Sequence, residues 1–242
     1  MTVIKTVDLT KKYKHIIAVD QLNLQVEQGE LLSLLGVNGA GKTTTIKMLS
    51  CLSLPTSGDA FLCGKSICKD TADVKELIAV SPQETAVAPG LSVRENLELV
   101  CGVYGFPKEK RNTKISEMIE MLGLGTVINK NAGKLSGGWQ RRLSIAMALI
   151  SEPEILFLDE PTLGLDVLAR GDLWDIIRSL KGKATIILTT HYMEEAEALS
   201  DRIAIMKDGK LIICDTVDQI KRAAETDVFE QAFVRLVKGM VR

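Results

Sequence analysis

A glycine-rich run at residues 36–43 constrains the fold more than any other stretch of the sequence. It reads Gly-Val-Asn-Gly-Ala-Gly-Lys-Thr, in which four residues separate the first glycine from a Gly-Lys-Thr triplet. An apolar run of strand length, 30–35, comes directly before it, and a plausible helix, 44–49, comes directly after it. Glycines let successive backbone N–H groups point inward, and the start of a helix carries a partial positive charge. The run therefore predicts a phosphate-binding loop, and its Lys-Thr pair argues against a turn that binds nothing.

The residue types of this loop predict how a nucleotide and its metal ion would be held. Lys42 would reach the outer phosphates, and the Thr43 hydroxyl would hold Mg²⁺. We assign nucleotide binding to Gly36, Val37, Asn38, Gly39, Ala40, Gly41, Lys42, Thr43 and Thr44.

Composition limits the classes of function. The chain has 242 residues, enough for one large domain or two lobes, and 46% of them are hydrophobic, enough for a core. Its 30 basic and 31 acidic side chains give no basic excess that would indicate nucleic acid as a partner. The five cysteines are scattered, which favours reduced thiols in a cytosolic protein over a zinc site. No apolar run approaches the ~20 residues that span a bilayer, so we expect any membrane role to be peripheral.

Hydrophobic periodicity and turn signals predict strands and helices with a helical insertion. The first strands are joined by connections too short for helical crossovers, so we expect them to be antiparallel. Ser92 and Glu95 form a capping-box pattern, which predicts the start of a helix. We expect strands at 4–9, 22–26, 30–35, 60–62, 78–80, 155–160 and 185–190, a polar turn at 11–14, and a hairpin around Asp208 and Gly209. We expect helices at 44–49, 92–104, 107–122, 136–150, 167–180 and 193–199, and a tail helix with an apolar stripe of Val228, Phe229, Ala232, Phe233, Leu236, Val237, Met240 and Val241.

A second motif supplies two carboxylates. The apolar run 155–158 is followed directly by Asp159 and Glu160. At the carboxyl end of a parallel strand beside the phosphate loop, Asp159 would bind Mg²⁺ directly or through water. Glu160 could polarise the attacking water. A pair of solvated acids is the alternative, and the presence of the phosphate loop argues against it.

The sequence Leu-Ser-Gly-Gly at 135–138 narrows the function further. Ser136, Gly137 and Gly138 open a helix, so their backbone N–H groups would form a second anion site. One chain rarely needs two such sites for one nucleotide. We therefore expect this site to bind the triphosphate held by another subunit.

In combination these motifs resemble the ATP-binding cassette (ABC) family, whose signature begins Leu-Ser-Gly-Gly, and the resemblance covers nearly the whole chain. It implies that the cofactors are ATP and Mg²⁺. It also implies that Tyr13 stacks on adenine and that Asp166, in the loop 163–166, lies at a dimer interface. The implied catalytic residues are Glu160 as the base, His191 as the switch histidine, and Gln83, which would sense Mg²⁺ and the transport domain. The implied metal site consists of Thr43, Gln83 and Asp159.

Some of these assignments depend on the resemblance alone. Without it, Tyr13 would fit a packing role, Gln83 a turn and His191 a structural role. One position departs from the family pattern, because Trp139 stands where the signature usually continues with glutamine. The phosphate-binding N–H groups do not depend on that side chain, but any sugar contact of the usual glutamine does, and Trp139 would instead pack within the interface. The runs 44–49 and 189–197 and the tail resemble the subfamily that serves ABC-2-type exporters.

The resemblance implies an α/β fold, with a P-loop NTPase core containing a mixed sheet, an antiparallel β lobe and an inserted helical lobe that carries the signature. We expect an ATPase domain at 1–225, with a helical subdomain at 84–150, and a short C-terminal amphipathic helix at 226–242. The expected protein is an ATP-hydrolysing subunit that pairs with a second cassette, as a homodimer or heterodimer, around two ATP molecules. It would drive a separate integral membrane permease of the ABC-2 type in export, from the cytoplasmic face of the membrane and without a nucleic-acid partner.

Three other readings are open at this point. A soluble cassette ATPase that acts on ribosomes or DNA usually has two cassettes in one chain or large insertions. A kinase would have no use for the Leu-Ser-Gly-Gly element. A regulatory cassette that binds ATP without hydrolysis would not need Glu160 and His191.

Overall fold

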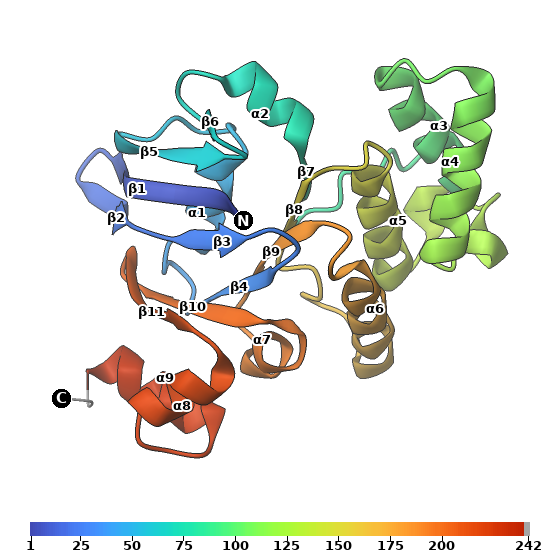
Figure 1. Cartoon of the computed structure of the whole chain (residues 1–242). Helices are drawn as coiled ribbons and strands as arrows, with labels where there is room; N and C mark the ends of the chain where they lie inside the picture. Colours follow the sequence, from blue (N-terminus) through green and yellow to red (C-terminus); the bar gives the residue numbers. More distant parts are fainter. Residues whose placement is uncertain (240–242) are drawn as a thin grey trace.

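A six-stranded sheet lies at the centre of the computed structural model, which describes residues 1–239 (Figure 1). The strands follow the order β11-β10-β4-β9-β8-β7, in which neighbours from β10 to β7 are parallel and β11 pairs antiparallel with β10 at the edge. Three inner strands are buried along their whole length, as expected for parallel strands covered on both faces. The strands are β4 (Leu31–Leu35), β7 (Ile78–Ser81), β8 (Ile155–Asp159), β9 (Thr185–Thr190), β10 (Arg202–Lys207) and β11 (Lys210–Asp215).

A second, antiparallel sheet packs on one face of the central sheet. A single buried cluster joins Ile4 in this second sheet with Ile46 of α1 (Lys42–Leu49) and Phe157 of β8. The expected antiparallel pairing of the first strands is therefore confirmed. The strands of this sheet are β1 (Thr2–Tyr13), β2 (Ile16–Leu22), β3 (Gln25–Glu27), β5 (Ser57–Leu62) and β6 (Lys65–Ser66).

Two predictions within this sheet are wrong. Of the predicted polar turn 11–14, only Lys14 lies in a turn, because β1 continues to Tyr13 and pairs there with β2. The expected strand 22–26 is two strands that pair with different halves of β1. The chain breaks between them at Asn23, whose amide group donates to the Asp8 carboxylate at 2.8 Å and accepts from the Asp8 N–H at 3.0 Å. These side-chain bonds replace the backbone ladder at that point.

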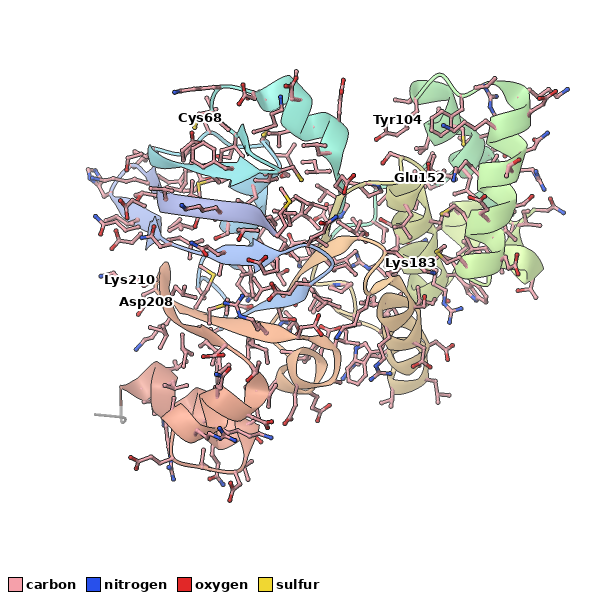
Figure 2. All side chains as sticks on the ribbon, in the orientation of Figure 1. Cys68, Tyr104, Glu152, Lys183, Asp208 and Lys210 are labelled. Carbon is pink, nitrogen blue, oxygen red and sulfur yellow. The ribbon has the colours of Figure 1, made fainter. Side chains whose placement is uncertain are left out.

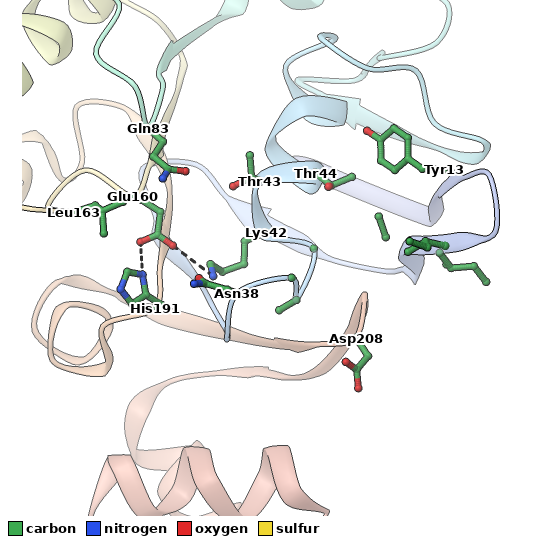
Figure 3. Close-up of a pocket in the computed structure, with 16 residues that line it drawn as sticks. Tyr13, Asn38, Lys42, Thr43, Thr44, Gln83, Glu160, Leu163, His191 and Asp208 are labelled. Carbon is green, nitrogen blue, oxygen red and sulfur yellow. Dashed lines mark hydrogen bonds and ion pairs between the residues drawn. The ribbon is translucent and has the colours of Figure 1, made fainter.

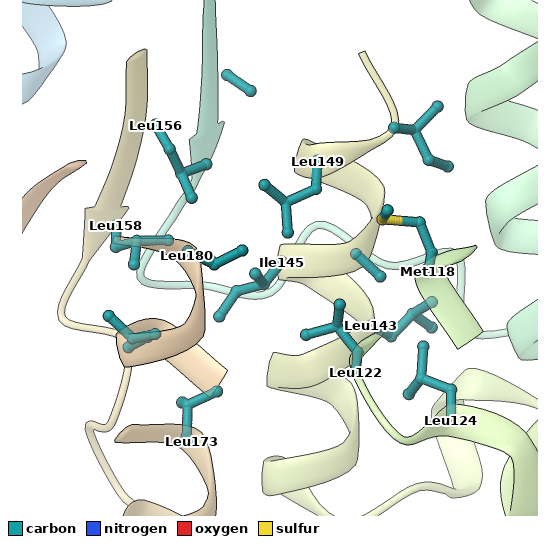
Figure 4. Packing of buried hydrophobic residues seen from close by; sticks show 14 of the residues in the cluster. Met118, Leu122, Leu124, Leu143, Ile145, Leu149, Leu156, Leu158, Leu173 and Leu180 are labelled. Atoms are coloured by element: carbon teal, nitrogen blue, oxygen red, sulfur yellow. The ribbon is translucent and has the colours of Figure 1, made fainter. Parts of the chain in front are cut away.

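The opposite face of the central sheet packs against helices. α5 (Gly137–Leu149) and α6 (Val167–Leu180) lie against it, and α3 (Val93–Val103) and α4 (Lys108–Met121) extend this helical block to one side of the molecule (Figure 1). Figure 4 shows Leu143 and Ile145 of α5 between the leucines of β8 and those of the helical block. The predicted capping box starts α3, because the Ser92 hydroxyl accepts from the Glu95 N–H and the Glu95 carboxylate accepts from the Ser92 N–H at 2.7 Å. The helical insertion therefore shares its core with the sheet.

The remaining helices complete the fold. α7 (Met193–Leu199) follows the prediction, whereas α2 (Thr71–Leu77) and α8 (Val217–Ala223) were not predicted. The tail helix α9 (Phe229–Lys238) buries Phe229, Ala232 and Phe233, while the predicted stripe residues Met240 and Val241 lie outside the described residues. Within residues 1–239, no helix combines the length and the apolar character that crossing a bilayer requires.

Candidate functional site

The glycine-rich loop joins β4 to α1. Its sequence requires glycine for two different structural reasons. Gly39 and Gly41 have φ of 83° and 102°, in the left-handed region that favours glycine. Gly36 has ordinary φ, but a Cβ added there would lie 2.4 Å from the Met206 carbonyl oxygen of β10. The loop can therefore turn tightly and still lie against the central sheet.

Lys42 and Glu160 meet inside this loop. The Lys42 ammonium donates to the Gly36 carbonyl oxygen at 2.7 Å and lies 3.4 Å from Glu160 Oε1 (Figure 3). Both side chains are buried. A cation that can bind phosphate and a carboxylate that can accept a proton are thus side by side.

His191 completes a row of three charged or titratable groups. Its Nδ1 lies 2.7 Å from Glu160 Oε2, so Lys42 and His191 contact different oxygens of one carboxylate (Figure 3). The backbone of Glu160 is itself fixed, since its N–H donates to Thr189 Oγ1 at 2.9 Å and its φ of 49° is in the left-handed region. Such a conformation in a residue other than glycine occurs at active sites as well as in turns.

Asp159 and Thr43 form the candidate metal site. The Thr43 hydroxyl donates to Asp159 Oδ1 at 3.0 Å, and the Thr189 hydroxyl donates to the same oxygen. Among residues 1–239, no group of three His, Cys, Asp or Glu side chains could form a protein-only metal cage. A hydroxyl and one carboxylate suit Mg²⁺, which proteins usually bind through one or two carboxylates together with water and substrate phosphates. The donor set therefore fits Mg²⁺.

A pocket of about 620 Å³ opens beside these groups. Tyr13 lies at one end of it, half exposed, with the Lys11 ammonium 5.0 Å from its ring centroid. Asp208 lines the pocket from the hairpin between β10 and β11, where Figure 2 shows it near Lys210. Of the predicted residues, those that line the pocket are Tyr13, Asn38, Gly39, Ala40, Gly41, Lys42, Thr43, Thr44, Gln83, Glu160 and His191. Gly36, Val37 and Asp159 do not line it.

The remaining predicted site residues lie elsewhere on the surface. Ser136 and Gly137 are exposed at the start of α5, and the Ser136 hydroxyl makes no capping hydrogen bond to the helix. Asp166 is exposed and caps α6 by accepting from the Ala169 N–H at 2.9 Å. The signature is thus separate from the pocket of its own chain.

Trp139 is half-buried and belongs to the helical core. The Arg142 guanidinium lies 4.9 Å from its ring centroid and pairs with Asp172 of α6 at 2.7 Å. Trp139 therefore packs against the ion pair that joins α5 to α6.

Two residues near the site, Thr189 and Arg141, were not predicted from the sequence. Thr189 holds both Asp159 and Glu160, but it stands within a run of apolar and threonine residues that indicates only a strand. Arg141 is buried and donates to the backbone of Gln83 at 2.7 Å. Its position beside the signature glycines was the available signal.

The chain is similar in sequence to known proteins. A family profile described as ABC transporter matches residues 19–163. The chain is 40% identical over 242 residues to the probable multidrug ABC transporter ATP-binding protein YbhF of Escherichia coli, which covers 98% of this chain and 42% of that protein. It is 41% identical over 214 residues to the doxorubicin resistance ATP-binding protein DrrA of Mycobacterium tuberculosis, with 87% and 64% covered. The chain thus spans less than two thirds of the length of these two relatives.

Two solved structures have the same fold. An ATP-binding subunit of an ABC transporter superposes with a TM-score of 0.86 and 27% identity, covering 97% of this chain and 99% of the other. A dimeric ATP-binding cassette in a post-hydrolysis state, bound to ADP and Pi, superposes with a TM-score of 0.79 and 28% identity, covering 88% and 98%. The predicted α/β fold with its antiparallel and helical lobes is confirmed.

Proposed function

Because this chain belongs to the ABC transporter family, we propose that it is an ATP-binding and ATP-hydrolysing subunit of a transporter. One observation carries the proposal: Lys42 and His191 contact the two oxygens of Glu160, at 3.4 and 2.7 Å, inside a glycine-rich pocket. The ADP and Pi of the related dimeric cassette are the products that this reaction would give.

Each group has a distinct part in the proposed reaction. The loop N–H groups and Lys42 bind the β- and γ-phosphates. A water oxygen attacks the γ-phosphorus, its proton passes to the Glu160 carboxylate, and ADP leaves. His191 holds the second Glu160 oxygen and thereby orients the base. Thr43, Asp159 and Gln83 would hold Mg²⁺, which would supply positive charge next to the phosphates.

Hydrolysis by Glu160→Gln tests this function. The substitution keeps the size of the side chain and removes its basicity, so the rate of phosphate release should fall by ~10²–10⁴-fold, the usual contribution of a general base. ATP affinity should persist because Lys42 and the loop are unchanged. Glu194→Gln, at an exposed position of α7, is the matched control. Full hydrolysis by Glu160→Gln would contradict the assigned base.

We further propose that the chain drives an integral membrane permease of the ABC-2 type, from the cytoplasmic face of the membrane. A groove of about 370 Å³ beside β7 and α5 supports a protein partner, and Ala86, Tyr104 and Met147 line it. Two of its lining residues, Leu52 and Tyr104, are exposed apolar side chains. The names of the relatives, which refer to multidrug and doxorubicin resistance, favour export. We also propose an ATPase domain at 1–225, with a helical subdomain at 84–150, and a C-terminal helix at 226–242.

Cross-linking tests the partner. A cysteine placed at Ala86, in the groove, should cross-link to a co-purified membrane protein. A cysteine placed at Asp218, exposed on the distant helix α8, is the control and should give far less of that product. Cross-links confined to ribosomal proteins or DNA would favour the soluble cassette ATPase instead.

A further inference from the structure

The side chain of Arg141 joins the signature helix α5 to the segment that carries Gln83. Its Nη1 donates to the Pro82 carbonyl oxygen at 2.6 Å, and its Nη2 donates to the Gln83 carbonyl oxygen at 2.7 Å. The two nitrogens belong to one planar group and the two carbonyls are consecutive, so the contact fixes both the position and the orientation of this backbone. Arg141 is only 4% exposed, so water competes little for these bonds.

A second contact lies one turn further along α5. Ser144 Oγ and Ser81 Oγ are 2.9 Å apart, and both are buried. Arg141 and Ser144 are three residues apart, which places them on the same face of the helix. The helix that begins at the signature is therefore fastened to three successive residues, 81–83.

Stability alone is a poor account of a charged group at this position. In the described part of the chain, the hydrogen-bond partners of the guanidinium are backbone carbonyls. Burial lowers the pKa of Arg141, while the charges of Asp159 and Glu195 act in the opposite direction. Burying a charge is costly, and an apolar side chain of similar volume is often at least as stabilising. The guanidinium is better explained by the backbone that it holds.

That backbone belongs to a residue between two hollows. Gln83 lines the nucleotide pocket together with Thr43 and Glu160. It also lines a hollow of about 390 Å³ together with Gly137 of the signature and Leu165 of the loop before α6. A displacement of Gln83 would thus change the lining of both the nucleotide pocket and the hollow beside the signature.

We propose that Arg141 is a positioning residue, which holds Gln83 at the nucleotide site and makes its position depend on that of the signature helix. This inference rests on the proposed function, since it takes Gln83 to act on Mg²⁺ bound with ATP. Gln83 lines the nucleotide pocket of its own chain, whereas Ser136 and Gly137 are exposed at the start of α5. Arg141 is the direct link between the two.

Arg141→Met tests the link, because methionine fills similar space without hydrogen-bond donors. Amide hydrogen exchange of residues 81–90, measured without nucleotide, should be faster than in the wild type. Mg²⁺ should increase the affinity for ATP, and the Mg²⁺ concentration that gives half of this increase should rise by ~10–100-fold in the variant. Metal affinity usually falls by this factor when a hydrogen-bond partner of a metal ligand is removed. ATP binding without Mg²⁺ should be unchanged. Arg178→Ala, which removes an exposed arginine of α6, should alter none of these quantities.

Arg141→Lys keeps the charge but cannot hold both carbonyls in one plane, so it should show the same changes to a smaller extent. Arg141→Lys also provides the test if the methionine variant fails to fold. Wild-type exchange and a wild-type Mg²⁺ requirement would overturn the proposal. Faster exchange with an unchanged Mg²⁺ requirement would overturn it too, because the contact would then be structural only. A wild-type chain that binds no ATP would contradict the proposed function. Amide hydrogen exchange measured without nucleotide would still show whether Arg141 fixes the backbone of Gln83.

Discussion

Among single residues, Lys42 should contribute most to nucleotide affinity. Charge-assisted hydrogen bonds to two phosphates are worth about 1.5–3 kcal/mol each, so Lys42→Ala should raise the Kd for ATP by ~10²-fold or more. Equilibrium binding of a fluorescent ATP analogue measures the change. Lys47→Ala removes an exposed lysine from the same helix and is the control. Unchanged affinity in Lys42→Ala would contradict the phosphate-loop assignment.

Glu195 is a buried carboxyl that should make stability depend on pH. It is fully buried on α7 and accepts a hydrogen bond from Trp174 Nε1 at 3.0 Å. Burial raises its pKa above the ordinary value of 4.5. The native state therefore keeps a proton that the unfolded chain releases, so this group lowers the free energy of unfolding as the pH rises from 4.5 towards its native pKa.

Glu195→Gln should remove that pH dependence, because the amide is neutral throughout. The free energy of unfolding of the variant minus that of the wild type should increase as the pH rises from 4.5 towards the native pKa of Glu195, as followed by urea denaturation. Glu194→Gln, at an exposed position, should show a flat difference. Parallel curves for Glu195→Gln and the wild type would mean that Glu195 is already ionised in the native state.

Single residues also mark the limit of prediction from sequence. Lys42, Glu160 and His191 were selected from their motifs, and the structure brings them together in one pocket. Thr189 and Arg141 were not selected, because their partners lie 30 and 58 residues away in the chain. Such pairs depend on which strands are neighbours in the sheet and on how α5 packs.

At the scale of elements, the junction between the phosphate loop and β2 has little spare room. A Cβ at Gly41 would lie 2.5 Å from the Ala18 carbonyl oxygen, whereas a Cβ at Gly39 would meet nothing within 4 Å. Both glycines have positive φ, so alanine is strained at either position by ~1–2 kcal/mol. Gly41→Ala should lower the free energy of unfolding more than Gly39→Ala, because it must also move β2. Equal losses in urea denaturation would show that the strand yields freely.

Elements with strong local signals were predicted well, and weak ones were not. The capping box marked α3, and the apolar run before two carboxylates marked β8. α2 and α8 have seven residues each and bury one residue each, Val74 and Ile220, so they lack a detectable stripe. β1 was predicted too short because its polar end is stabilised by pairing with β2, which local composition does not encode.

At the scale of the whole molecule, several exposed features lie around the signature and the start of α6. Val167 and Leu168 are 79% and 82% exposed, beside Asp166. At Ser136, the N-terminus of α5 is also exposed, and its backbone N–H groups could bind a phosphate. A second subunit that carries ATP would cover both this helix N-terminus and the exposed apolar residues. The pocket of one chain and the signature of the other would then enclose one nucleotide.

Glu160→Gln should therefore accumulate as an ATP-bound dimer, with its partner subunit if the native pair is heteromeric. Hydrolysis is blocked while the phosphate-binding groups are intact, so the signature of one subunit should stay closed on the nucleotide of the other. Adding Ser136→Arg should prevent that dimer by placing bulk and charge where phosphate meets backbone N–H. Adding Thr113→Arg instead, at an exposed position of α4, brings the same charge to the same lobe and should leave the dimer intact. Size-exclusion chromatography with light scattering, with and without Mg-ATP, distinguishes these states. A Glu160→Gln chain that stays monomeric in saturating ATP, even with its partner present, would count against the shared site.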